Sequence, residues 1–422
     1  MTAPSSPRRL WCLLVAFAAC WFLSFVWFPQ LYLFVGVNHF GVWFLDTYAL
    51  LATNDAISLG RDPWIMNPLD PFGRGHVYSH WWLHFRDLGL TRAHNLWLGL
   101  AFVAAFFPAA LARLRPRTPG EVVWYLVVLC ASPLLLAVNR ANNDLVVFAL
   151  LAPVVPCLLS SRAVVRLAAP VLIAIAAGLK FYPAIAGLVL LAGTDARELR
   201  RRLVVGVFLL AAVGVNIAPD LVHFAGVAPK AEGLMTFGSV NLLEAGGVHG
   251  PRAVALGFVL GALAGLAFAR SRVFDGWEIA PADRAAWLSF VLGAVLLTGC
   301  FFTSTNFSYR WVFALWLAPL LWRLPRDAAA PAAVRRLAGL TVALLVVALW
   351  ADALATTVLA TATGHASRDA IMRWADRVFL VEQPLTWAFF ACLLGFLTHF
   401  TRGGLRVLLG RVNPDAPAPS AG

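Results

Sequence analysis

The sequence predicts an all-α membrane protein that crosses the bilayer many times. Hydrophobic residues make up 61% of the 422 residues, and charged residues make up only 13%. The mean hydropathy of +0.78 lies far outside the range of soluble globular domains. Several apolar stretches, including 10–35, 96–111 and 337–358, approach or exceed the roughly 20 residues that a helix needs to cross the hydrocarbon. We therefore expect one integral membrane domain over 1–411, with about twelve transmembrane or half-membrane helices.

The two ends of the chain are predicted to differ. The first apolar run follows Arg8 and Arg9, is too long for the core of a signal peptide and lacks a clear small-residue cleavage site. We interpret it as a retained signal-anchor helix. The last residues, 412–422, are rich in proline and alanine and are expected to form a disordered cytoplasmic tail.

The arginines predict the orientation in the membrane. If Arg8 and Arg9 are cytoplasmic and the chain changes side at each apolar run, most of the 33 basic residues fall in short cytoplasmic loops, as the positive-inside rule requires. The net charge of +12 then reflects topology, and we expect no nucleic-acid partner. Both termini are predicted to be cytoplasmic in the plasma membrane. The polar outer loops are 36–94, 139–143, 218–250, 304–310 and 360–383.

The stretch 167–193 is predicted to enter and leave the membrane on the cytoplasmic side. Arginines flank it at both ends, and Lys180 and Pro183 split it near its middle. We expect a hairpin of two short helices, because non-helical backbone at that depth is tolerated only where it lines a cavity within the protein. A lysine there costs about 2.5–3.5 kcal/mol on insertion scales and is often functional. The alternative is that Lys180 snorkels to the outer interface.

Two further polar clusters are expected at outer ends of helices. The stretch 139–147 reads NRANNDLVV, in which Asn142, Asn143 and Asp144 can cap a helix and Arg140 lies four residues before Asp144. Helix capping accounts for only part of this cluster, so lining a cavity remains the other interpretation. The stretch 305–310 reads TNFSYR and ends in Tyr309 and Arg310.

Three basic residues of these segments suit an anionic ligand. Arginine forks match phosphate geometry, so Arg140, Lys180 and Arg310 are candidates for binding one anionic headgroup near the outer leaflet. The alternative is that the arginines anchor their helices at the interface.

The long first loop carries the candidate base. Asp46 follows the first helix, and 48–59 has helical spacing of apolar residues, which predicts a juxtamembrane helix on the outer surface. A carboxylate at that depth suits general-base chemistry on a sugar hydroxyl, and an N-terminal helix cap is the alternative. In the same loop His76, His80 and His84 lie four residues apart. They suit either a metal site or an aromatic interface belt with hydrogen-bonded histidines, which we favour.

Several motifs of soluble enzymes are absent. The sequence has no GxxxxGK, no GxGxxG after a strand and no Asp-x-Asp pair of the kind that holds a metal in nucleotide-sugar enzymes. No cofactor is firmly implied and no divalent metal is expected. An activated donor would therefore be borne by the membrane.

The polar motifs together resemble a known family. RANND at 140–144 is similar to an Arg-Gly-Asn-x-Asp motif, with Ala141 at the usual glycine. GLKFYP at 178–183 is similar to a lysine–proline hairpin, and Asp46 and Tyr309–Arg310 occupy matching places. These features resemble the GT-C superfamily of polyprenyl-phosphate-sugar glycosyltransferases, and within it glycosyltransferase family 87, the alpha-mannosyltransferase-like proteins.

The resemblance implies a function and a set of roles. The fold would be GT-C-like with an amphipathic helix in the first outer loop. The enzyme would be a hexosyltransferase that moves a sugar, with mannose favoured, from a polyprenyl-phosphate donor to a lipid or glycan acceptor on the outer face, with inversion. Asp46 would be the general base and Lys180, Arg310 and Arg140 would bind the donor phosphate. The predicted cavity-lining residues are Asn142, Asn143, Asp144, Tyr182, Tyr309 and His80. The alternatives are a transporter or flippase of lipid-linked sugars and an oligosaccharide ligase.

Overall fold

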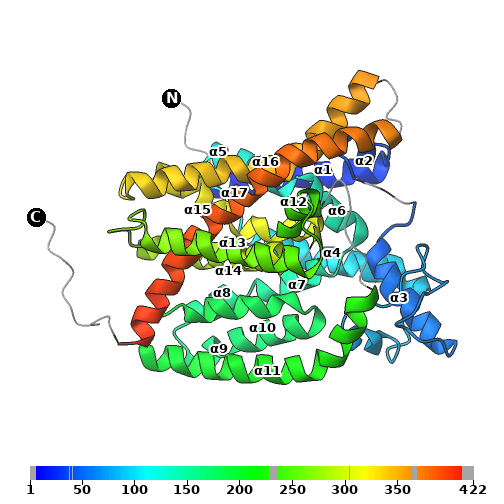
Figure 1. The fold of residues 1–422 in the computed structure, drawn as a ribbon, viewed down its shortest axis with the longest axis horizontal. Helices are drawn as coiled ribbons and strands as arrows, with labels where there is room; N and C mark the ends of the chain where they lie inside the picture. Colours follow the sequence, from blue (N-terminus) through cyan, green and yellow to red (C-terminus); the bar gives the residue numbers. More distant parts are fainter. Residues whose placement is uncertain are drawn as a thin grey trace, which may run out of the picture.

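The protein is a bundle of apolar helices (Figure 1). The computed structural model describes residues 6–37, 39, 41–227, 236–303, 305–363 and 368–410. Within these residues, seven helices are long and apolar enough to cross a membrane, and a bent pair makes an eighth candidate span. This confirms the predicted class of a helical membrane protein, whereas the number twelve stays a prediction. The predicted tail 412–422 lies outside the described residues.

The candidate spans differ in how much they face lipid. They are α1 (Pro7–Trp27), α4 (Asn95–Leu111), α11 (Ala196–Val227), α13 (Pro251–Arg270), α14 (Arg284–Thr303), α16 (Ala332–Thr363) and α17 (Arg368–Leu408). The apolar window of α14 is 89% buried, whereas that of α1 is 22% buried and that of α11 is 17% buried. The helix α14 is therefore the centre of the bundle, and α1 and α11 present most of their surface outward.

The bundle has two ends that carry different features (Figure 1). The helix α3 (Leu45–Ser58) lies at one end, which we call the α3 end. The start of α1, the end of α4 and the start of α14 line one common cavity, so they meet at the opposite end. Each of these helices therefore runs from one end of the bundle to the other.

The stretch 167–193 forms two short helices that break at Lys180. The helix α10 (Ala168–Leu179) ends where Lys180 takes an extended conformation, and the 3-10 helix η3 (Tyr182–Leu191) follows and packs against α10 and α14. Pro183 has no N–H to donate to the Leu179 carbonyl, which a continued helix would require. That carbonyl instead accepts a hydrogen bond from the Trp82 indole at 2.8 Å. The break thus ties the loop between α3 and α4 to the end of α10.

A second break comes between α5 (Pro119–Leu129) and α6 (Ser132–Arg140), which are bent by 55°. Pro133 lies in the first turn of α6 and cannot donate to Leu129, so the helix stops and restarts. The shorter elements that follow are α7 (Asp144–Leu151), α8 (Val154–Leu159) and α9 (Ala163–Arg166).

The remaining elements are connections. The strand β1 (Thr236–Phe237) pairs antiparallel with β2 (Asn306–Phe307), with Thr236 opposite Phe307. The other elements are α2 (Leu31–Phe34), η1 (His80–Phe85), η2 (Arg92–His94), α12 (Ser239–Ala245), η4 (Pro281–Asp283), η5 (Ser308–Trp316), α15 (Ala318–Arg323) and η6 (Leu324–Arg326).

The stretch 360–383, predicted as an outer loop, is largely helical. The helix α16 continues to Thr363 and α17 begins at Arg368. Hydropathy marks where a chain leaves the apolar layer. It does not mark where a helix ends, and the alanine, methionine and arginine of this stretch favour helix in water as well.

Candidate functional site

The first turn of α3 is fixed against the end of α6. The Phe44 N–H donates to the Asn139 carbonyl at 3.1 Å, and the Thr47 hydroxyl donates to the Ala141 carbonyl at 2.9 Å. The helix begins at Leu45, so Asp46 lies inside its first turn. The predicted helix over 48–59 therefore starts too late. Much of α3 is buried in the protein, which corrects the expectation of a helix lying on the surface.

Asp46 is a buried carboxylate with three polar partners. Its side chain lies 2.9 Å from Arg140 Nη2, 3.4 Å from Arg74 Nη1 and 2.6 Å from Asn142 Nδ2. Burial alone would raise the pKa of Asp46, yet Arg140, Arg74 and the bond from Asn142 together hold that pKa below its usual value of 3.8. Asp46 is therefore ionised at neutral pH and held in one orientation.

Arg74 is a member of this site that the sequence analysis missed. Its guanidinium forms a two-point contact with Asp70, at 3.0 Å from Nε to Oδ1 and 2.9 Å from Nη2 to Oδ2. Asp70 also accepts the N–H groups of Phe72 and Arg74, which closes a tight turn. The signal in the sequence is the run NPLDPFGRG, whose Asp, Pro and Gly residues are typical of an ordered turn.

Asp144 is the second buried carboxylate. Lys180 Nζ lies 2.5 Å from Asp144 Oδ1, and the Tyr182 hydroxyl donates to the same oxygen at 2.7 Å. Arg310 Nε lies 3.9 Å from Asp144 Oδ2, which is too far for a hydrogen bond. Lys180 also donates to the Asn143 side-chain oxygen at 2.6 Å. The lysine therefore has a carboxylate partner in the structure, which the sequence analysis did not foresee.

Asn142 joins the two carboxylates into one network. Its Nδ2 donates to Asp46, and its Oδ1 accepts from Lys180 at 3.2 Å. The preceding residue, Ala141, has a φ of 41° and ψ of 52°, a left-handed turn between α6 and α7 that favours glycine. In the Arg-Gly-Asn-x-Asp motif that residues 140–144 resemble, glycine occupies the position of Ala141. The turn directs the Asn142 side chain toward Asp46 and Lys180.

Aromatic rings enclose the cations of the network. Lys180 Nζ lies 5.4–5.9 Å from the ring centroids of Tyr309, Tyr78 and Tyr182. The guanidinium of Arg310 lies 4.6 Å from the centroid of Tyr182. These distances suit cation–π attraction, which is stronger where water is excluded. Tyr78 is the second residue that the sequence analysis missed.

The structure brings together nine of the ten predicted site residues. We call them, with Arg74, Asp70 and Tyr78, the Asp46–Asp144 network: Asp46, Arg140, Asn142, Asn143, Asp144, Lys180, Tyr182, Tyr309 and Arg310. They come from α3, the turn between α6 and α7, the break after α10, η3 and η5.

His80 is the exception. Its Nδ1 lies 2.8 Å from Asp220 in α11. His76 bonds the Ser79 carbonyl and His84 bonds Asp87, so the three histidines have three different partners. This arrangement does not support the alternative of a metal site formed by these histidines. Over the described residues, no group of three or more His, Cys, Asp and Glu side chains is placed to hold a metal ion.

The charges of the network do not cancel. Four cations, Arg74, Arg140, Lys180 and Arg310, face the three carboxylates Asp46, Asp70 and Asp144, which leaves one positive charge in excess. In the described residues, Arg310 Nε and Asn143 Nδ2 are buried donors without a hydrogen-bond partner, and Asp144 Oδ2, 3.9 Å from Arg310 Nε, is a buried acceptor without one. An excess cation and unused donors suit an anion with several acceptor oxygens.

Comparison with known proteins finds no relative. No protein-family model, no curated protein and no solved structure matches this chain. The assignment of a function therefore rests on the chemistry of the network and on the motifs that carry the resemblance.

Proposed function

We propose that the protein is a membrane glycosyltransferase that moves a sugar from a polyprenyl-phosphate donor to a hydroxyl of a lipid or glycan acceptor. The observation that carries this proposal is one hydrogen-bonded network that holds both an ionised carboxylate, Asp46, and an excess of positive charge around Lys180 and Arg310. Glycosyl transfer needs those two features close together: a group that takes the proton of the acceptor and cations that hold the departing phosphate.

The proposed reaction is a single displacement with inversion. The acceptor oxygen forms a bond to the anomeric carbon while the bond from that carbon to the phosphate oxygen breaks. The electron pair of the broken bond leaves with the polyprenyl phosphate, and the acceptor proton passes to Asp46. The lowered pKa makes Asp46 a weak base. A weak base suffices because the transition state resembles an oxocarbenium ion, at which the attacking hydroxyl becomes strongly acidic.

The charge of the network matches the donor. A polyprenyl-phosphate sugar is a phosphodiester with one negative charge, and the network has one positive charge in excess. When the sugar leaves, the phosphate gains a second negative charge, so cations fixed beforehand stabilise the transition state more than the ground state. Arg310, with its unused Nε donor, is the residue best suited to meet that new charge.

The identity of the sugar and the side of the membrane are part of the proposal. Mannose is supported by the resemblance, and an outward-facing site in the plasma membrane by the distribution of arginine. A transporter or flippase of lipid-linked sugars is the second candidate, because the 55° bend between α5 and α6 and the break at Lys180 are typical of discontinuous helices in transporters.

The test is Asp46→Asn in membranes supplied with radiolabelled polyprenyl-phosphate sugar and lipid extract. We expect the transfer rate to fall by about 10²- to 10⁴-fold while donor binding persists. Asp46→Glu keeps the charge that Arg140 and Arg74 require but displaces the carboxylate, so it should retain the fold and also lose transfer. The matched control is Asp62→Asn, an exposed residue of the same loop that only caps the Trp64 N–H.

Three results would count against the proposal. Transfer at the parental rate by folded Asp46→Asn protein rejects Asp46 as the base. Equal losses in Asp46→Asn and Asp62→Asn indicate a general effect of the loop. Movement of lipid-linked sugar across vesicles without any transfer by the parent protein favours the transporter. Asp55 is not a suitable control, because it pairs with Arg92 at 2.6 Å.

A further inference from the structure

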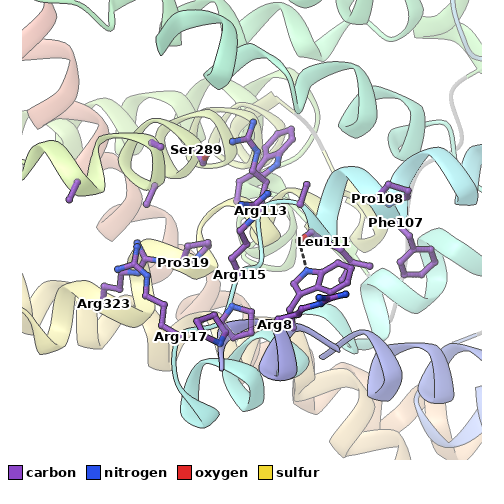
Figure 2. Close-up of a pocket in the computed structure, with 18 residues that line it drawn as sticks. Arg8, Phe107, Pro108, Leu111, Arg113, Arg115, Arg117, Ser289, Pro319 and Arg323 are labelled. Carbon is purple, nitrogen blue, oxygen red and sulfur yellow. Dashed lines mark hydrogen bonds between the residues drawn. The ribbon is translucent and has the colours of Figure 1, made fainter. Parts of the chain in front are cut away.

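A cavity of about 1090 Å³ lies at the opposite end of the bundle from α3 (Figure 2). Its volume is at the upper limit of the roughly 300–1,000 Å³ that is usual for ligand sites. The walls come from the start of α1, the end of α4, the connection to α5, the start of α14 and α15. Part of the lining is apolar: Trp11, Phe107, Pro108, Leu111, Trp316 and Pro319.

The rest of the lining is strongly basic. Five arginines surround the cavity and no acidic residue lines it: Arg8, Arg113, Arg115, Arg117 and Arg323. Figure 2 shows these side chains arranged around the cavity, three of them from the connection between α4 and α5. The cavity is therefore complementary to an anion that also carries apolar groups.

Most of this charge is uncompensated. Arg323 lies 3.1 Å from Asp283 and 3.6 Å from Glu121. Across the described residues, the guanidinium groups of Arg8, Arg115 and Arg117 form no ion pair with a carboxylate, although the backbone N–H of Arg117 donates to the Glu121 carboxylate. Burial lowers the pKa of Arg113, and repulsion by the like charge of Arg115 lowers it further. A bound anion would relieve that repulsion.

The cavity lies between helices that face lipid. Only 22% of the apolar window is buried in α1 and in α4. Trp11 of α1 is 38% exposed, and its indole donates to the Leu111 carbonyl at the end of α4. Tryptophan at a helix end is typical of the level of the lipid headgroups. A lipid can therefore reach the cavity from the side, with its headgroup among the arginines and its chains along α1 and α4.

We propose that this cavity binds an anionic phospholipid of the adjoining leaflet, which is the cytoplasmic leaflet in the predicted orientation. The lipid phosphate contacts Arg8, Arg115 and Arg117, whose guanidinium groups match phosphate oxygens in pairs. Basic sites between transmembrane helices on the cytoplasmic side are suited to anionic headgroups. This inference is independent of the proposed sugar transfer, which belongs to the α3 end.

The test uses the full chain in detergent, titrated with phosphatidylglycerol or phosphatidylcholine and followed by native mass spectrometry. The parent protein should bind phosphatidylglycerol more tightly. Arg115→Gln/Arg117→Gln should weaken that binding by roughly tenfold or more and leave phosphatidylcholine unaffected. The matched control is Arg270→Gln/Arg272→Gln, which removes two exposed arginines near the same end that do not line the cavity.

A second variant keeps every arginine in place. Ala112→Glu adds a carboxylate to the lining at an exposed helix end, where it should pair with the guanidinium groups and exclude the lipid phosphate. Equal affinity of the parent for the two lipids overturns the proposal, as does an equal loss in the control. Displacement of the lipid by millimolar inorganic phosphate would also overturn it, since the site would then select a soluble anion.

Discussion

The two ends of the bundle hold arginine in opposite ways. At the α3 end, Arg140 lies 2.9 Å from the carboxylate of Asp46, and both side chains are largely buried. At the opposite end, Arg115 and Arg117 are exposed, and their guanidinium groups form no ion pair with a carboxylate in the part of the chain that the structure describes. The first arrangement pairs each buried carboxylate with cations inside the protein and fixes a geometry. The second is left for a ligand to complete.

The difference follows from how many segments meet at each place. The Asp46–Asp144 network joins a helix start, a turn between two helices and two helix breaks, so both of its buried carboxylates, Asp46 and Asp144, have partners from other segments. The cavity is formed by helix ends and one connection, which supply cations but no carboxylate to its lining. A count of arginines therefore does not distinguish the proposed catalytic site from the proposed lipid site.

The largest expected effect is a difference in the free energy of unfolding between two arginine variants. Arg140→Gln leaves the buried carboxylate of Asp46 with only Arg74 as a cation, and breaking a buried pair costs about 3–5 kcal/mol. Arg115→Gln removes an uncompensated charge and should change the free energy of unfolding by no more than about 0.5 kcal/mol. Thermal unfolding of both purified variants in detergent measures the contrast. Equal destabilisation would remove the distinction between the two ends.

Acid should destabilise the α3 end. Burial lowers the pKa of His76 from 6.5 to about 4, against the opposing effect of its bond to the Ser79 carbonyl. Between these values the unfolded chain binds a proton that the folded protein does not, so stability is lost as the pH falls from 6.5 to 4, by up to about 3 kcal/mol.

Unfolding at pH 7 and pH 5 checks this dependence. His76→Gln should flatten the pH profile. Arg115→Gln should keep the parental profile, because arginine does not titrate in this range. An unchanged slope in His76→Gln would assign the acid sensitivity to another group, such as Asp46, whose lowered pKa removes stability only at still lower pH.

The smallest effect concerns the backbone that directs Asn142 into the network. Ala141→Gly should stabilise the protein by about 1 kcal/mol, because an alanine in the left-handed region is strained and a glycine is not. Ala137→Gly, in the interior of α6, should instead destabilise it by about 0.5–1 kcal/mol. If both variants lose stability alike, the turn at Ala141 is not strained.

The sequence by itself determined the membrane class and the chemistry that the membrane must tolerate. Apolar runs give the long helices because each run is a local sum over about 20 residues. Lys180 and Asp144 can also be recognised from the local sequence, because a charged side chain in an apolar segment costs free energy in any fold of the chain. The break at Lys180 also follows locally, from a proline that lacks its N–H.

Only the tertiary structure decided which charges meet. Asp46 and Asn142 are 96 residues apart and bond at 2.6 Å, and no periodicity encodes that contact. The same holds for Arg74, which contacts Asp46 from the loop after α3. It also holds for Asp144, which pairs with Lys180, a residue that the sequence predicts to bind phosphate. Electrostatic pairing depends on distance in space and on the exclusion of water, and both are set by the packing of segments that are remote in the chain.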